Sequence, residues 1–248
     1  MTLRMSGERE TKHDLRQALV EGTATDTDFD ALLPERAQMK SKRFWTPLAV
    51  AARAAQLFAD RGSTSVLDVG SGPGKFCLAL AAASPHLVVT GIEQRPELVE
   101  VARCAAKRLN VTNVRFILDD VSMAAWKDFD GFYFYNSFGE NFFDAHDRFD
   151  DSVELSEERF ITEILLVERA LLDAPIGTTV LTYHGFGGRM PRCYTLATEE
   201  VFGSNILRAW RKASVGREAD GAWLELSDGG IAETRFRKLS VGTLRGPT

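Results

Sequence analysis

An apolar run that ends in closely spaced glycines is the feature that most limits how this chain can fold. The sequence there reads Val66-Leu67-Asp68-Val69-Gly70-Ser71-Gly72-Pro73-Gly74-Lys75-Phe76. Glycine adopts positive φ without a Cβ penalty, and the unpaired N–H groups at a helix N-terminus attract polar ligand groups. We therefore predict a buried strand, a loop that approaches a nucleotide-like ligand closely, and a helix that follows the loop.

Helix and strand patterns alternate along most of the chain. Apolar residues with helical spacing predict helices at residues 47–60, 73–83, 96–109 and 157–172. Apolar and β-branched runs predict strands at residues 65–69, 87–92, 114–118, 131–135 and 178–183. Strands that alternate with helices in this way form right-handed βαβ crossovers. The chain is therefore predicted to have an α/β fold with a doubly wound, mainly parallel sheet.

Short strand-like runs joined by glycine-containing loops occupy the C-terminal third. They lie at residues 206–212, 222–226 and 234–239. Antiparallel strands joined by short glycine loops form hairpins. We therefore expect a C-terminal antiparallel hairpin to complete a seven-stranded sheet.

Composition limits the classes of protein to which the chain can belong. The 248 residues are 44% hydrophobic and carry a formal net charge of −5. No apolar stretch reaches the roughly 20 residues of a membrane-spanning helix, and the N-terminus lacks the apolar region of a signal peptide. We therefore expect a cytoplasmic protein without a membrane partner, and the acidic balance does not favour nucleic acid. Cys77, Cys104 and Cys193 lack metal-ligand spacing, so no metal site is predicted.

The glycine spacing in the loop separates two kinds of nucleotide-binding protein. Dinucleotide-binding loops follow the pattern Gly-x-Gly-x-x-Gly, whereas this chain has Gly70-x-Gly72-x-Gly74 with Asp68 two residues before it. This segment resembles motif I of class I S-adenosylmethionine (SAM) dependent methyltransferases, and the resemblance extends over about residues 45–185. It implies a Rossmann-like fold that binds SAM and releases S-adenosyl-L-homocysteine. A nicotinamide-dependent oxidoreductase is disfavoured.

The resemblance also divides the chain near residue 45. Residues 1–44 are predicted to be an N-terminal arm, partly mobile or helical, because they are polar and weakly periodic. Residues 45–248 are predicted to be the SAM-binding methyltransferase domain. Within it, an acidic insertion near residues 140–158 carries eight acidic residues and one basic residue, Arg148. Such a charge run is ordinarily a solvated surface, and an acidic rim that attracts a cationic substrate is the alternative.

The resemblance assigns cofactor contacts to residues that follow successive strands, where open α/β sheets bind their ligands. The loop would hold the methionine part of SAM, and Glu93 would accept hydrogen bonds from both ribose hydroxyls. Asp120, or alternatively Asp119, would accept a hydrogen bond from the adenine amine. An exposed turn acid is the alternative role for Glu93, and a capping acid for Asp120. The cofactor-binding candidates are Asp68, Gly70, Ser71, Gly72, Gly74, Glu93, Gln94, Asp119, Asp120, Val121 and Asn136.

Residues after the fourth and fifth predicted strands decide the chemistry. Amino-methylating members of the resembled family carry motifs such as Asn-Pro-Phe at the fourth strand end, where this chain has Asn136-Ser137-Phe138. Asn136 would orient a target nitrogen, and Glu140 or His184 would act as general base where the acceptor must lose a proton. A structural role is the alternative for His184, a lone histidine after a strand. Because Ser137 replaces the proline, Asn136 is also compatible with binding the SAM carboxylate region or capping a turn.

These residues predict methyl transfer to an acceptor whose identity stays open. The motif at Asn136 and the acidic insertion slightly favour a nitrogen atom, on a small molecule or on a protein side chain such as lysine. A small-molecule O-methyltransferase and a non-catalytic SAM-binding regulator are the alternatives, because a shared fold does not determine the acceptor. The sequence makes no prediction of oligomeric state.

Overall fold

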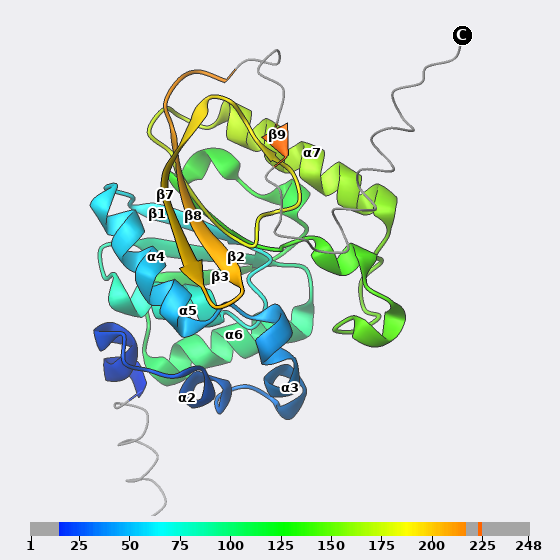
Figure 1. The fold of residues 1–248 in the computed structure, drawn as a ribbon. Helices are drawn as coiled ribbons and strands as arrows, with labels where there is room; N and C mark the ends of the chain where they lie inside the picture. Colours follow the sequence, from blue (N-terminus) through cyan, green and yellow to red (C-terminus); the bar gives the residue numbers. More distant parts are fainter. Residues whose placement is uncertain (1–14, 217–222, 225–248) are drawn as a thin grey trace, which may run out of the picture. The chain divides into compact units, whose positions relative to one another are not determined.

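Seven strands form one sheet in the computed structural model, which describes residues 15–216 and 223–224 (Figure 1). The strand order is β3-β2-β1-β4-β5-β8-β7, and β6 pairs with β9 in a separate ribbon. The strands are β1 (Ser65–Val69), β2 (Val88–Glu93), β3 (Val114–Leu118), β4 (Gly131–Tyr135), β5 (Thr179–Tyr183), β6 (Arg189–Met190), β7 (Tyr194–Phe202), β8 (Asn205–Lys212) and β9 (Trp223–Leu224). The helices with described bounds are α2 (Asp26–Asp30), α3 (Glu35–Phe44), α4 (Leu48–Asp60), α5 (Lys75–Ala83), α6 (Pro96–Leu109) and α7 (Glu157–Asp173).

Local sequence accounts for most of these boundaries. β1, β3, β4 and α6 have the predicted bounds. α4 begins after Pro47 at its N-cap and ends before Gly62, whose φ is 71°. α7 begins after Ser156, whose Oγ accepts a hydrogen bond from Arg159 N at 3.1 Å. The predicted α/β fold, with a mainly parallel sheet and a C-terminal antiparallel pair, is confirmed.

The C-terminal hairpin differs from the predicted one in its partner strand. β8 pairs with the preceding strand β7, which the sequence analysis missed. Gly203, at the first position of the two-residue turn, has a φ of 61°, as a type II′ hairpin turn requires. Glu199 and Glu200 obscured the strand pattern of β7, because glutamate is depleted in strands. Of the later runs, only Trp223–Leu224 is described, as the partner of β6, and residues 234–239 lie outside the described residues.

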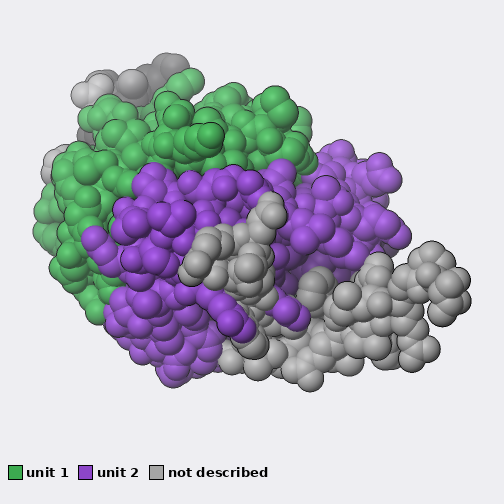
Figure 2. All heavy atoms as spheres, turned by 90° about the horizontal axis from the view of Figure 1, so that it is seen from above, with its two compact units in different colours: residues 1–133, 177–181 green, residues 134–176, 182–248 purple. Residues whose placement is uncertain are grey.

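Contacts divide the chain into two compact units (Figure 2). The first comprises residues 1–133 and 177–181, and the second comprises residues 134–176 and 182–248. The loop between β1 and α5 belongs to the first unit. The segments that follow β4 and β5 belong to the second.

The first unit is built on the parallel strands β3, β2 and β1. Asp68 in β1 lies beside Gly91 in β2, and Glu93 at the end of β2 lies beside Leu118 in β3. This register brings the carboxyl ends of three strands together. α5 packs against α4, α6 and β2, so the helix that follows the glycine loop lies inside the core of the unit.

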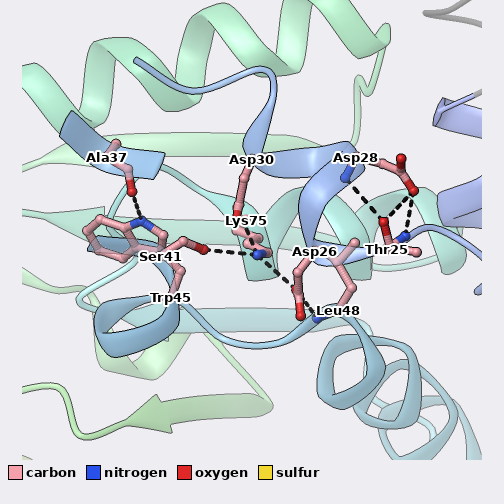
Figure 3. Close-up of polar contacts among 9 residues, drawn as sticks. All are labelled: Thr25, Asp26, Asp28, Asp30, Ala37, Ser41, Trp45, Leu48 and Lys75. Carbon is pink, nitrogen blue, oxygen red and sulfur yellow. Dashed lines mark hydrogen bonds and ion pairs between the residues drawn. The ribbon is translucent and has the colours of Figure 1, made fainter. Parts of the chain in front are cut away.

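The described part of the N-terminal arm is helical. Residues 15–21 form a helix, and α2 is capped by reciprocal hydrogen bonds between Thr25 and Asp28 (Figure 3). Asp26, at the start of α2, accepts a hydrogen bond from Leu48 N at 2.9 Å, which satisfies an N–H at the N-terminus of α4.

A buried lysine joins this arm to the helix after the glycine loop. Only 2% of the Lys75 side chain is exposed. As Figure 3 shows, its ammonium group is surrounded by acceptors from the arm, which are Asp26 Oδ1 at 2.8 Å, Asp30 Oδ1 at 2.8 Å and Ser41 Oγ at 3.2 Å. A buried ammonium requires such partners, since desolvation without them is costly. Lys75 therefore couples the folding of the arm to that of α5.

In the second unit, the C-terminus of α7 is closed by a lysine from β8. Lys212 Nζ donates to Leu171 O at 2.8 Å and to Leu172 O at 2.6 Å. These bonds satisfy carbonyl groups that the last turn of a helix leaves without partners. α7 has 17 residues, and neither it nor any other helix in the described part of the chain is long and apolar enough to cross a bilayer.

Replacing Lys75 tests the link between the arm and α5. We expect Lys75→Met to lower the free energy of unfolding by about 3 kcal/mol, because removing one partner strands charges at a buried site. The exposed Lys127→Met is the matched control and should change stability by less than about 0.5 kcal/mol. Urea denaturation measures both, and equal small losses in the two variants would contradict the coupling.

Candidate functional site

Three glycines with positive φ shape the loop between β1 and α5. Their φ values are 78° at Gly70, 54° at Gly72 and 80° at Gly74, a region that residues with a Cβ rarely adopt. The N–H groups of Gly70 and Ser71 both donate to Ile92 O at 3.0 Å. The predicted loop therefore exists and is fixed to the end of β2.

Missing Cβ atoms let other side chains lie against the loop. A Cβ on Gly72 would lie 2.6 Å from a ring carbon of Trp45, and a Cβ on Gly91 would lie 2.5 Å from Ser71 Oγ. Trp45 is itself held by its Nε1, which donates to Ala37 O at 2.9 Å (Figure 3). The Trp45 ring thus lies directly against the loop backbone.

Ser71 carries a polar group without a partner. Its Oγ atom is buried and has no hydrogen bond among the described residues. Leaving a buried hydroxyl unpaired costs about 1–3 kcal/mol, so such a group points to a ligand or an ordered water molecule. Ser71 therefore supplies a donor and an acceptor at the loop.

Glu93 lies at the end of β2, as predicted, but it is buried and not a solvent-exposed turn acid. Its Oε2 accepts from Gly72 N at 3.0 Å, and its Oε1 accepts from Arg95 N at 2.9 Å. An ionised carboxylate is an acceptor-only group with about four acceptor sites on its two oxygens. Glu93 holds the loop in place and retains the chemistry needed to accept hydrogen bonds from hydroxyl groups.

Asp68 is buried inside the same unit. The pKa of Asp68 is raised to about 7, chiefly by burial and to a smaller extent by the charge of Glu93, against the lowering effect of a hydrogen bond from the Cys77 thiol at 3.1 Å. Burial, together with the nearby Asp68, also raises the pKa of Cys77 well above its usual value. A nearby cation would therefore favour loss of the proton from Asp68 near neutral pH.

The candidates for contact with adenine follow β2 and β3 and differ in their exposure. Asp120 Oδ1 accepts from Ser122 N at 2.9 Å at the N-terminus of the 3₁₀ helix Val121–Met123, so the capping role that the sequence left open is present. Asp119 is exposed and accepts from Asp120 N at 2.9 Å. Val121 is buried, and Gln94 is half-buried. Contacts of these residues with adenine stay a prediction.

In the second unit, Asn136 and His184 both have left-handed backbones. Their φ values are 46° and 63°, which is uncommon outside glycine. Asn136 N donates to Gly185 O at 2.9 Å, so the segments after β4 and β5 are joined at these residues. The Asn136 side chain also lies against Gly139, where a Cβ would overlap its amide. Sequence reasoning predicted both residues as site candidates, and the structure brings their backbones together.

Glu140 and the acidic insertion form a hydrogen-bonded loop. Glu140 Oε1 accepts from Phe149 N at 2.6 Å. Asn141 Nδ2 donates to Glu163 Oε2 in α7 at 3.1 Å, and Asn141 Oδ1 accepts from Ser156 N at 3.1 Å. The predicted base Glu140 thus has a structural contact inside the insertion.

The insertion also gathers three groups that are able to ligate a metal. Ligand atoms of Asp144, His146 and Asp147 lie within 4.8 Å of one another. Two of the three side chains are exposed, and exposed acidic groups commonly occur without an ion. No metal site was predicted from the sequence at these three residues.

Three further residues contact the candidates and were not identified from sequence as site residues. Trp45 lies against Gly72, and the Cys77 thiol donates a hydrogen bond to Asp68. Asn205 places its Oδ1 2.7 Å from Nδ1 of His184. Each pair joins residues that follow no recognised motif spacing. Only the three-dimensional structure reveals them.

Known proteins resemble parts of this chain in sequence. Residues 60–145 match a family model described as "Methyltransferase domain". The release factor glutamine methyltransferase of Vibrio cholerae serotype O1 is 49% identical over 51 residues, which are 21% of this chain and 18% of that protein. The tRNA (guanine-N(7)-)-methyltransferase of Mycoplasmopsis pulmonis is 37% identical over 60 residues, which are 24% of this chain and 30% of that protein. The chain thus spans less than a third of the length of these two relatives.

The fold has counterparts among solved structures. An RNA methyltransferase from Salinibacter ruber, solved with S-adenosyl-L-homocysteine, superposes with a TM-score of 0.51 at 21% identity, over 70% of this chain and 96% of that one. At this identity the likeness concerns the fold. The chain therefore carries a methyltransferase domain at residues 60–145 and has the Rossmann-like fold of the class I SAM-dependent methyltransferases.

Proposed function

We propose that this protein is a SAM-dependent methyltransferase whose cofactor binds at the glycine loop of the first unit. The buried Ser71 hydroxyl, for which residues 15–216 and 223–224 provide no hydrogen-bond partner, is the observation that carries the proposal. It lies on a loop of positive-φ glycines whose Gly72 N–H is bound by the Glu93 carboxylate. These groups suit a ligand that has a polar amino-acid part and a ribose diol. The match of residues 60–145 to the methyltransferase domain supports the same ligand.

The proposed contacts follow the chemistry of each side chain. The methionine part would be held by Asp68, Gly70, Ser71, Gly72 and Gly74. Glu93 would accept hydrogen bonds from the ribose hydroxyls, because an ionised carboxylate is an acceptor-only group with two oxygens. The adenosine would be flanked by Gln94, Asp119, Asp120 and Val121.

The residues that follow β4 and β5 are proposed to bind the methyl acceptor. The bound cofactor supplies a methyl group on an activated, positively charged sulfur, so the protein contributes mainly orientation. Asn136 would orient the acceptor, with binding of the SAM carboxylate region as its other proposed role, and His184 would take a proton where one must leave. We favour His184 over Glu140 as the base because Glu140 Oε1 is already engaged by Phe149 N.

We favour a nitrogen acceptor on a protein side chain or a small molecule. The segment Asn136-Ser137-Phe138 supports a nitrogen, and the name of one relative specifies guanine N7 as its acceptor atom. That relative acts on tRNA by its name, but the net charge of −5 and the eight acids of the insertion oppose binding to a polyanion. RNA, an oxygen acceptor and SAM binding without turnover are outcomes that the experiment below distinguishes.

Calorimetry and labelling together test this function. The protein should bind SAM and S-adenosyl-L-homocysteine and should not bind NAD. Incubation with isotopically labelled SAM and fractionated extract should then transfer label to protein or to a small amine, as detected by mass spectrometry. Binding of NAD without SAM would refute the proposal, and SAM binding with no labelled product in protein, RNA or small-molecule fractions would favour a regulator.

Removing the Glu93 carboxylate should weaken cofactor binding. We expect Glu93→Ala to cost about 1–3 kcal/mol of SAM affinity, because both the proposed ribose contacts and the acceptor for Gly72 N are lost. Calorimetry at a temperature where both proteins remain folded measures the change. The exposed Glu97→Ala is the matched control, and unchanged affinity in Glu93→Ala would show that the ribose assignment is wrong.

Asp68 should make cofactor binding depend on pH. Because burial raises the pKa of Asp68 to about 7 in the free protein, the carboxyl is mostly protonated below pH 7 and must release its proton to pair with a cationic group. The affinity for SAM should therefore rise between pH 5.5 and 7 and level off above that range. Asp68→Asn should flatten this profile, whereas the exposed Asp60→Asn should retain it. Identical profiles in Asp68→Asn and the unmodified protein would contradict the assignment.

Asn136 should affect turnover more than cofactor binding. Asn136→Gly is the suitable variant because glycine adopts the observed φ of 46° without strain, so only the side chain is removed. We expect kcat to fall about 10- to 100-fold, the usual effect of losing one orienting hydrogen bond of about 1–3 kcal/mol. Calorimetry should show SAM affinity within about threefold of the original. If neither quantity changes, the Asn136 side chain is structural.

A further inference from the structure

His184 is held by two contacts to the start of β8, within the second unit. Its backbone N donates to Ile206 O at 3.4 Å, and its Nδ1 lies 2.7 Å from Asn205 Oδ1. Asn205 directly follows the Gly203-Ser204 turn of the β7–β8 hairpin. The Nδ1 atom of the imidazole is therefore hydrogen-bonded to Asn205, a residue of β8 that is paired with Phe202 of β7.

The chemistry of an amide oxygen determines which ring nitrogen carries hydrogen. A carbonyl oxygen only accepts hydrogen bonds, so a bond between Asn205 Oδ1 and His184 Nδ1 requires a hydrogen on Nδ1. In a neutral imidazole the other nitrogen, Nε2, then has its lone pair free of hydrogen. Unlike a carboxylate, the amide brings no charge to the ring.

We propose that Asn205 is a positioning residue that holds His184 in the Nδ1–H tautomer and so makes Nε2 a proton acceptor. The inference rests on the proposed function, in which His184 receives the proton of the methyl acceptor. In that step one proton moves from the N–H or O–H group of the acceptor to Nε2. The Nδ1–H bond to Asn205 Oδ1 persists throughout, so the ring keeps its orientation when it becomes an imidazolium.

The local backbone supports a fixed ring. His184 adopts a φ of 63°, and Gly185 and Gly187 follow with φ values of 68° and 88°. Gly185 O accepts from Asn136 N at 2.9 Å, so the turn after β5 is tied to the segment after β4 as well as to β8. A side chain at such a constrained position has few alternative orientations, and the hydrogen bond to Asn205 selects among them.

Nuclear magnetic resonance of the whole chain with isotope-labelled histidine tests the tautomer directly. The chain has four histidines, and His184→Gln identifies the His184 signal by its loss. In the unmodified protein, we expect the neutral form of His184 to carry its hydrogen on Nδ1. Asn205→Ala should lose this single-tautomer signature, and Asn205→Asp, which also offers an acceptor oxygen, should restore it. Ser204→Ala, at an exposed neighbouring position, is the matched control and should leave the signal unchanged.

Two results would overturn the proposal. One is hydrogen on Nε2 in the unmodified protein, and the other is an unaltered His184 signal in Asn205→Ala. Circular dichroism of each variant establishes that the fold is retained, and Asn205→Asp tests the same contact where Asn205→Ala fails to fold.

Kinetics separate the positioning role from a structural one. Once an acceptor is known, Asn205→Ala should lower kcat at least about tenfold with little change in KM, because general base catalysis contributes about 10²–10⁴-fold. A lost tautomer signature with unchanged kcat would overturn the proton-acceptor role. Failure of the unmodified protein to bind SAM in calorimetry would instead refute the proposed function, and the resonance result for the His184–Asn205 contact would be independent of it.

Discussion

The glycine loop of the first unit keeps its shape because β2 binds it. Ile92 O accepts the N–H groups of both Gly70 and Ser71, and the Glu93 carboxylate accepts the N–H of Gly72. The parallel register that sets Val69 beside Ile92 makes this possible, and positive φ at the glycines turns the N–H groups toward β2. A carboxylate at position 93 therefore serves the geometry of the loop as well as the proposed contact with ribose.

The N-terminal arm and Trp45, which directly follows it, also support the glycine loop and the helix after it. Trp45 lies against Gly72, and Lys75 at the start of α5 lies between carboxylates of α2. Burying an ammonium group is tolerable only where acceptors surround it, so the arm must be docked whenever α5 is packed as observed. The geometry of the loop thereby depends on residues some 30 to 50 positions earlier in the chain, which spacing rules for glycine motifs do not include.

Capping residues in the sequence predicted the helix ends, because these ends depend on interactions between neighbouring residues. Proline at an N-cap, serine before a helix and glycine after one set the ends of α4 and α7, and those ends were found as expected. β7 was not predicted because glutamate is depleted in strands. In the structure, Glu199 and Glu200 lie opposite Arg208 and Leu207 of β8. Contacts such as Cys77 with Asp68 depend on tertiary packing, and no spacing in the sequence encodes them. The candidate site residues were predicted from the sequence, while their partners and burial are visible only in the structure.

Left-handed backbone positions occur among the candidate residues of both units. In the first unit they are occupied by Gly70, Gly72 and Gly74, where the backbone itself faces the proposed ligand. In the second unit, Asn136 and His184 hold such positions with side chains present, although left-handed backbone in a residue with a side chain costs on the order of 1–3 kcal/mol. A turn alone would be more stable with glycine. Asn110 has a φ of 51° as the C-cap of α6, so a left-handed backbone alone does not assign a chemical role, and the roles proposed for Asn136 and His184 rest on the chemistry of their side chains after β4 and β5.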